Sequence, residues 1–167
     1  NTASKYNLIN YSDKYIDYTY DNRAAIWPPN KNKNQEYIFI KDNSTGLYYI
    51  KTNYTDKFLS VDSESPINGT TISFKDKSQS CSQKWQVILQ DGYYKIISAC
   101  NKNQAIDINP NNVVGSGLKT WERNNGIHQK IKIVEIDENN LDEKVFTIKN
   151  TASKYNLINY SDKYIDY

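Results

Sequence analysis

Short apolar and aromatic runs, separated by polar turns, follow one another along the whole chain. The runs are four to seven residues long, and Asn, Asp, Gly, Ser and Lys dominate the turns between them. This rhythm is typical of all-β domains, whereas the apolar spacing of an amphipathic helix is nearly absent. The expected strands are 6–10, 15–18, 25–27, 35–40, 47–51, 58–61, 70–74, 84–89, 93–97, 105–108, 118–121 and 130–136.

The segment Gln83-Lys84-Trp85 opens one of these strands with a polar Gln, a spacer and a large aromatic residue. Similar segments, Gln35-Glu36-Tyr37 and Gln129-Lys130-Ile131, begin 48 residues before and 46 residues after it. Three occurrences of one strand signature at near-equal spacings indicate a threefold internal repeat. The repeats would span about 1–41, 42–89 and 90–136.

The register of the first repeat is open between two alternatives. In the first, residues 10–16 correspond to residues 53–59, which makes 6–10 the first strand. In the second, 145–149 is the first strand and 5–9 is the second. The pattern alone does not decide between them.

An exact duplication links the two ends of the sequence. Residues 1–18 recur without change as residues 150–167. The duplication indicates a parent built from near-identical tandem copies and cut out of phase, or else an engineered overlap or permutant. We expect residues 137–144, which are polar and acidic, to be a linker, and 145–167 to start a second copy. That copy would complete the first repeat, be displaced, or pair with a neighbouring molecule.

Composition narrows the classes of function. Apolar residues make up 38% of the chain and aromatic residues 13%, with 15 Tyr, so a chain of 167 residues can build a core. The net charge is only +2 and the basic residues are scattered, which argues against nucleic acid as a partner. No apolar run approaches the roughly 18 residues of a transmembrane segment.

Two cysteines, Cys81 and Cys100, lie near expected strand ends at the boundary between the second and third repeats. A disulfide requires Cα atoms within about 7 Å of each other, which the sequence cannot establish. A disulfide and two buried free thiols therefore both remain open.

The chemistry of catalysis is not visible in the sequence. The chain has one His, and no Ser–His–Asp set or metal-ligand spacing accompanies it. There is no Gly-rich phosphate loop, and the carboxylates are not arranged as a glycosidase pair. We expect a protein that is not an enzyme and that needs no cofactor.

Three four-stranded repeats, each closed by a Gln-x-aromatic or Gln-x-apolar strand, resemble the ricin-type β-trefoil lectin family over about residues 1–136. The resemblance implies an all-β fold, a β-trefoil with pseudo-threefold symmetry. It also implies that Tyr37, Trp85 and Ile131 are core residues rather than ligand-binding ones.

In that family the sugar meets an acid at the end of the second strand, an aromatic residue on the third, and an Asn just before the Gln of the fourth. A carboxylate accepts hydrogen bonds from adjacent hydroxyls, and an aromatic ring stacks on the apolar face of the sugar. The third repeat matches most fully. It offers Asp107, Trp121 and Gln129, with His128 in place of the Asn and Lys119 where a Gln often sits.

The first repeat offers Trp27, Asn34 and Gln35 at the corresponding positions. Asp17 is its acid in the first register, whereas the second register leaves Asn10 nearest. In the second repeat Ser60 replaces the acid and Phe74 is taken as the aromatic residue. Because a hydroxyl cannot replace a carboxylate as a charged acceptor, we expect that site to bind sugar weakly or not at all.

The resemblance implies a bacterial carbohydrate-binding module of a tandem-repeat protein, secreted or exposed at the cell surface. Its ligands would be galactose-type sugars on cell-surface glycoconjugates. Related modules serve toxins, haemagglutinins or glycoside hydrolases. The alternatives are a module with decayed sugar sites that binds a protein such as another toxin subunit, and a structural spacer. Self-association through the duplicated terminal strands is a further expectation.

Overall fold

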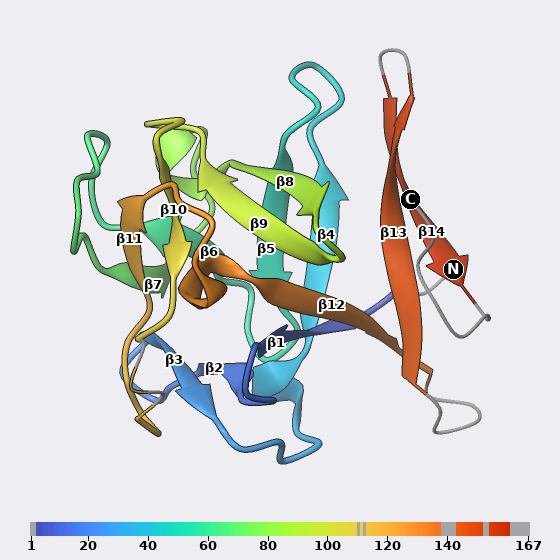
Figure 1. The fold of residues 1–167 in the computed structure, drawn as a ribbon, viewed down its shortest axis with the longest axis horizontal. Coiled ribbons are helices and arrows are strands. Elements are labelled where there is room, and N and C mark those ends of the chain that lie inside the picture. Colours follow the sequence, from blue (N-terminus) through green and yellow to red (C-terminus); the bar gives the residue numbers. More distant parts are fainter. Residues whose placement is uncertain (1–2, 110, 112, 138–142, 152–153, 161–167) are drawn as a thin grey trace.

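The computed structural model describes residues 3–109, 111, 113–137, 143–151 and 154–160, the last two ranges by their backbone alone. Strands dominate, with three short 3₁₀ turns between them (Figure 1). The elements are β1 (Tyr6–Asn10), β2 (Tyr15–Tyr18), β3 (Ala24–Trp27), η1 (Lys33–Gln35), β4 (Tyr37–Lys41), β5 (Tyr48–Thr52), β6 (Phe58–Val61), β7 (Ile72–Lys75), η2 (Cys81–Gln83), β8 (Trp85–Gln90), β9 (Tyr93–Ser98), β10 (Gln104–Asp107), β11 (Lys119–Glu122), η3 (Ile127–Gln129), β12 (Ile131–Ile136), β13 (Glu143–Thr151) and β14 (Lys154–Tyr160).

The first twelve strands form a closed barrel capped by three hairpins. The barrel runs β1–β4–β5–β8–β9–β12 and returns to β1, with every neighbouring pair antiparallel. The hairpins β2–β3, β6–β7 and β10–β11 project from it, and single bridges join them to one another. This arrangement is a β-trefoil, so the predicted fold is confirmed.

The signature aromatic positions lie in the core. Tyr37, Trp85 and Ile131 are fully buried at the start of the fourth strand of each repeat. The polar atoms of the two rings are satisfied, because Tyr37 Oη donates to Ile16 O at 2.9 Å and Trp85 Nε1 donates to Leu59 O at 3.1 Å. The prediction that these three residues are structural is confirmed.

A Gln lies two residues before each of these positions, and its side chain is hydrogen-bonded to the backbone of the loop that precedes the Gln. Each Gln side chain is buried, donates to one backbone carbonyl of the loop and accepts from one backbone N–H. The carbonyls are those of Pro28, Asp76 and Glu122, and the N–H groups are those of Asn30, Ser78 and Asn124.

A disulfide joins the second and third repeats. Cys81 on η2 and Cys100 after β9 are bonded, with their Cα atoms 5.0 Å apart. The alternative of two free thiols is therefore wrong. By restricting the unfolded chain, a loop of this size stabilises the fold by about 3 kcal/mol.

The first repeat adopts the first of the two registers. Residues 6–10 form β1, which pairs over its whole length with β12. The turn after it is closed by Asn10, whose Oδ1 accepts from the N–H groups of Ser12 and Lys14. This places Asp17 on β2, at the position that Asp107 occupies on β10.

Beyond the trefoil, β13 pairs with the last part of β12 and forms an antiparallel hairpin with β14 beside the barrel (Figure 1). Strand β14 repeats the sequence of β1. The division of the chain into a trefoil, a linker and the start of a second copy stays a prediction. Residues 138–142 and 161–167, on which it partly depends, lie outside the described residues. In the described part of the chain, no helix has the length and apolar character needed to cross a membrane.

Candidate functional site

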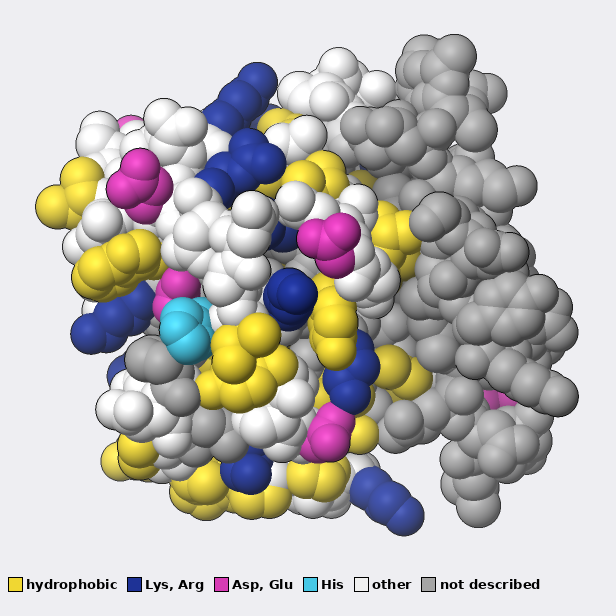
Figure 2. All heavy atoms as spheres, viewed as in Figure 1, with side chains coloured by type: hydrophobic (Ala, Val, Ile, Leu, Met, Phe, Trp, Pro, Cys, Tyr) yellow, Lys and Arg dark blue, Asp and Glu magenta, His cyan; other side chains and the backbone are white. Residues whose placement is uncertain are grey.

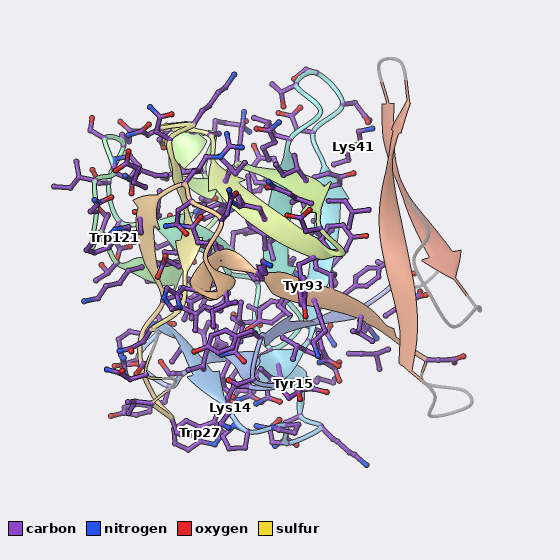
Figure 3. The ribbon with its side chains drawn as sticks, in the orientation of Figure 1. Lys14, Tyr15, Trp27, Lys41, Tyr93 and Trp121 are labelled. Atoms are coloured by element: carbon purple, nitrogen blue, oxygen red, sulfur yellow. A yellow bond between two sulfur atoms is a disulfide. The ribbon has the colours of Figure 1, made fainter. Side chains whose placement is uncertain are left out.

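Two of the three hairpins carry an exposed Trp. Trp27 ends β3 and Trp121 lies on β11, and both are 45% exposed. Figure 3 shows them at separate places on the side of the trefoil away from β13. Each lies on the strand paired with the strand that carries the predicted acid. Two separate candidate sites result, one in the first repeat and one in the third.

In the first repeat, two amides hold the acid. Nδ2 of Asn34 donates to both carboxylate oxygens of Asp17, at 3.0 and 3.1 Å. Nε2 of Gln35 donates to Oδ2 of Asp17 at 2.9 Å. A carboxylate can accept roughly four hydrogen bonds, so this arrangement fixes its orientation and leaves acceptor capacity.

Burial changes the pKa of Asp17. Loss of solvent raises the pKa of its carboxyl group above the ordinary value, while the hydrogen bonds from Gln35 and Asn34 oppose the shift. The amides therefore orient the carboxylate and also favour its charged form.

The ring of Trp27 rests on a loop of the third repeat. Gly115 has a φ of +86°, and a methyl group there would lie 3.4 Å from Cζ3 of the ring. The N–H of Gly115 donates to Ile26 O at 2.8 Å, which holds the loop against β3. Glycine is suited to this position by its left-handed backbone and by the close approach of the ring.

The third repeat repeats the arrangement with one change. Nε2 of Gln129 donates to Oδ2 of Asp107 at 3.1 Å, and Trp121 rests beside Gly69 of the second repeat, where a methyl group would lie 3.9 Å from Cζ3. His128 occupies the place of Asn34, but no hydrogen bond joins its ring to Asp107. Its Nδ1 is buried and has no hydrogen-bond partner among the described residues.

The pKa of the Asp107 carboxyl group is also raised, again because burial disfavours the charged form. The hydrogen bond from Gln129 and the charge of His128 oppose the shift. Lys119 is exposed and stands opposite Asp107 in the β10–β11 ladder. It is thus brought next to the site, at the position that Ala25 occupies opposite Asp17.

The second repeat lacks both chemical parts. Ser60 is buried at the acid position, and its hydroxyl lies 3.5 Å from that of Ser82. Phe74 is not the exposed aromatic residue expected there, because it is 2% exposed and stacks on Tyr37 with ring centroids 5.9 Å apart. Lys75 takes the exposed position instead.

The strand pairing explains this error. Trp27 stands opposite Tyr15, and Lys75 stands opposite Phe58 at the equivalent step of the hairpin. Successive residues of a strand face opposite sides, so Phe74, one step earlier, points into the core. The spacing to the Gln was the available signal in the sequence. Trp27 and Trp121 each lie eight residues before Gln35 and Gln129, and Lys75 lies eight residues before Gln83.

The visible face of the molecule carries Lys, Arg, Asp and Glu side chains intermingled, with apolar groups in small separate clusters (Figure 2). Among the described residues, no three His, Cys, Asp or Glu side chains are grouped as metal ligands would be. What the geometry offers is hydrogen-bond acceptors and amides beside exposed aromatic rings.

Comparison with known proteins yields a family model and solved structures. A family model described as ricin-type beta-trefoil lectin domain-like matches residues 82–163. No curated protein matches the sequence.

Three solved structures illustrate the likeness in fold. The designed threefold-symmetric protein ThreeFoil has a TM-score of 0.71 at 21% identity, covering 77% of this chain and 96% of its own. The ricin B-like lectin of Macrolepiota procera, in complex with lactose, has a TM-score of 0.68 at 16% identity, covering 80% and 96%. An exo-β-1,3-galactanase of Clostridium thermocellum has a TM-score of 0.73 at 24% identity, covering 81% of this chain and 31% of its own.

Proposed function

We propose that this chain, which has the ricin-type β-trefoil lectin fold, binds carbohydrates through its first and third repeats and does not act on them chemically. One observation carries the proposal. The same set of an amide-held carboxylate and an exposed Trp occurs twice, on symmetry-related hairpins, around Asp17 and Asp107. Each set suits a sugar that presents adjacent hydroxyls and one apolar face.

Galactose-type sugars are the proposed ligands. The Macrolepiota procera lectin of the same fold was solved with lactose, and the Clostridium thermocellum enzyme that contains this fold is a galactanase. A sugar with a hydroxyl-rich edge and a C–H face would donate to the carboxylate and stack on the Trp ring at the same time.

A secreted or surface-exposed protein is the proposed setting. The Cys81–Cys100 disulfide supports it, because disulfides persist in oxidising compartments. The duplicated segment 150–167 supports a tandem array, in which several weak sites raise avidity through effective concentration. Such a module would attach a bacterial toxin, a haemagglutinin or a glycoside hydrolase to its glycan.

The test is calorimetry with lactose on the wild-type chain and on Trp27→Ala, Trp121→Ala and the double variant. Each single change should weaken one of the two sites, with affinity at that site falling up to about tenfold, because a stacked aromatic contact is worth up to about 1.5 kcal/mol. Lys75→Ala, at the equivalent position of the second repeat, is the matched control and should bind as wild type. A glycan array without any binding would reject the lectin function and leave a protein partner or a spacer role.

A further inference from the structure

A hollow in the surface adjoins the first candidate site. It has a volume of about 450 Å³ and opens to solvent. Tyr18 follows Asp17 on β2 and therefore points to the opposite face of that strand, whereas Asn34, which donates to Asp17, links the hollow to the first candidate site. It is lined by Tyr18, Tyr20, Asn32, Lys33, Asn34 and Tyr54.

Aromatic rings form its wall. Tyr18 is buried and packs against Tyr54 and Phe74, with ring centroids 5.6 and 4.8 Å away, and its hydroxyl donates to Asn22. Tyr54 is 60% exposed and Tyr20 is 97% exposed. One buried, packed ring and two accessible rings can together meet the C–H face of a sugar.

The polar groups come from η1 and the residue before it. The side chain of Asn34 is fixed by its bonds to Asp17 and by one from Asn30 Nδ2 to its Oδ1, at 3.3 Å. Asn32 and Lys33 are exposed, and no ion pair involves Lys33 among the described residues. None of the described residues that line the hollow is an Asp or a Glu.

We infer that this hollow binds a sugar residue that carries a carboxylate, such as a uronic acid. The charge of the lining is the reverse of that at Asp17 and Asp107: the protein supplies the cation, and the ligand must supply the anion. A single exposed ammonium beside amides and rings suits one carboxylate among hydroxyls. The hollow adjoins the first proposed sugar site and shares Asn34 with it, but Asp17 and Trp27 do not line it.

The experiment is an NMR titration of the whole chain with glucuronic acid and, as the neutral counterpart, with glucose. We expect glucuronic acid to shift the resonances of Tyr20, Lys33 and Tyr54, and glucose to leave them in place. Lys33→Gln should weaken the binding about two- to fivefold, the range for an exposed ion pair. Tyr20→Ala should weaken it about fivefold through lost ring contact.

Lys102→Gln, which removes another exposed ammonium, is the control and should leave the titration unchanged. Equal shifts with both sugars would overturn the role of Lys33. No shift at these residues with glucuronic acid would overturn the site itself. Neither result bears on lactose binding at Trp27 and Trp121, so the two proposals fail independently.

Discussion

The two candidate carboxylates differ in how many side chains hold them. Asp17 accepts from Asn34 and Gln35, whereas Asp107 accepts from Gln129 alone, since His128 stands where the second amide would be. Asp107 therefore keeps more acceptor capacity for a ligand and has a less constrained orientation. The first and third sites should differ in fine specificity for this reason.

Sugar binding at these residues should weaken in acid. The pKa of both carboxyl groups is raised, mainly by burial, so protonation begins at a higher pH than the ordinary value near 3.9. A protonated group no longer accepts charge-assisted hydrogen bonds. Calorimetry with lactose from pH 7 downward should show affinity falling with a midpoint above about 3.9.

The contribution of these two groups to stability should change with pH in the direction opposite to binding. A raised pKa in the folded state means that the folded chain binds more protons, so their contribution to the free energy of unfolding falls as pH rises through the folded pKa. Binding should therefore be lost on acidification without unfolding caused by Asp17 or Asp107. Affinity that stays constant down to a pH near 3.9 would contradict the assignment of these carboxylates to the sites.

At the scale of the elements, the fourth strands and their Gln residues are the parts most readable from sequence. The Gln-x-aromatic or Gln-x-apolar spacing located Tyr37, Trp85 and Ile131, because a large buried residue at the same position of each repeat recurs at a regular interval in the sequence. The aromatic residue of the second repeat was less readable. In β7, Phe74 and Lys75 are neighbours, and a slip of one residue exchanges the core face for the solvent face.

Two further features depend on three-dimensional distances that no local pattern contains. The disulfide required the Cα atoms of Cys81 and Cys100 to approach within bonding range. The register of the first repeat required knowing that residues 6–10, rather than 145–149, form the barrel strand between β12 and β4.

Removing the disulfide should lower stability without abolishing binding. The double variant Cys81→Ala/Cys100→Ala should lose about 3 kcal/mol of unfolding free energy. For a trefoil of this size that corresponds to a melting temperature lower by roughly 10 °C. Differential scanning calorimetry measures it, and reduction of the wild-type chain should reproduce the shift. An unchanged melting temperature would mean that the unfolded state is already restricted.

At the scale of the whole molecule, pseudo-threefold symmetry supplies a scaffold for a third site in the second repeat. Gln83 is already in place and donates to a loop carbonyl as Gln35 and Gln129 do. What is missing is an acid at Ser60, an amide at Ser82 and a ring at Lys75.

The triple variant Ser60→Asp/Lys75→Trp/Ser82→Asn should raise the stoichiometry of lactose binding by one per chain, measured by calorimetry. The new Asn and Gln83 would hold the carboxylate as Asn34 and Gln35 hold Asp17. Ser60→Asp alone is the control, and it should lose stability without gaining a site because a buried carboxylate would lack its amide partners. An unchanged stoichiometry in a folded triple variant would show that symmetry alone does not define a site.

The glycines beneath the Trp rings have a consequence for how such a molecule could arise. Gly115 of the third repeat supports Trp27 of the first, and Gly69 of the second supports Trp121 of the third. Each exposed Trp therefore contacts a glycine of the repeat that precedes it in the cyclic order of the trefoil. A single repeat cut from the chain would carry a Trp without the glycine loop that contacts it. Three such peptides assembled as a trimer would supply this loop to one another. Fusion of an ancestral homotrimer would preserve these sites, and growth from a working monomeric repeat would not.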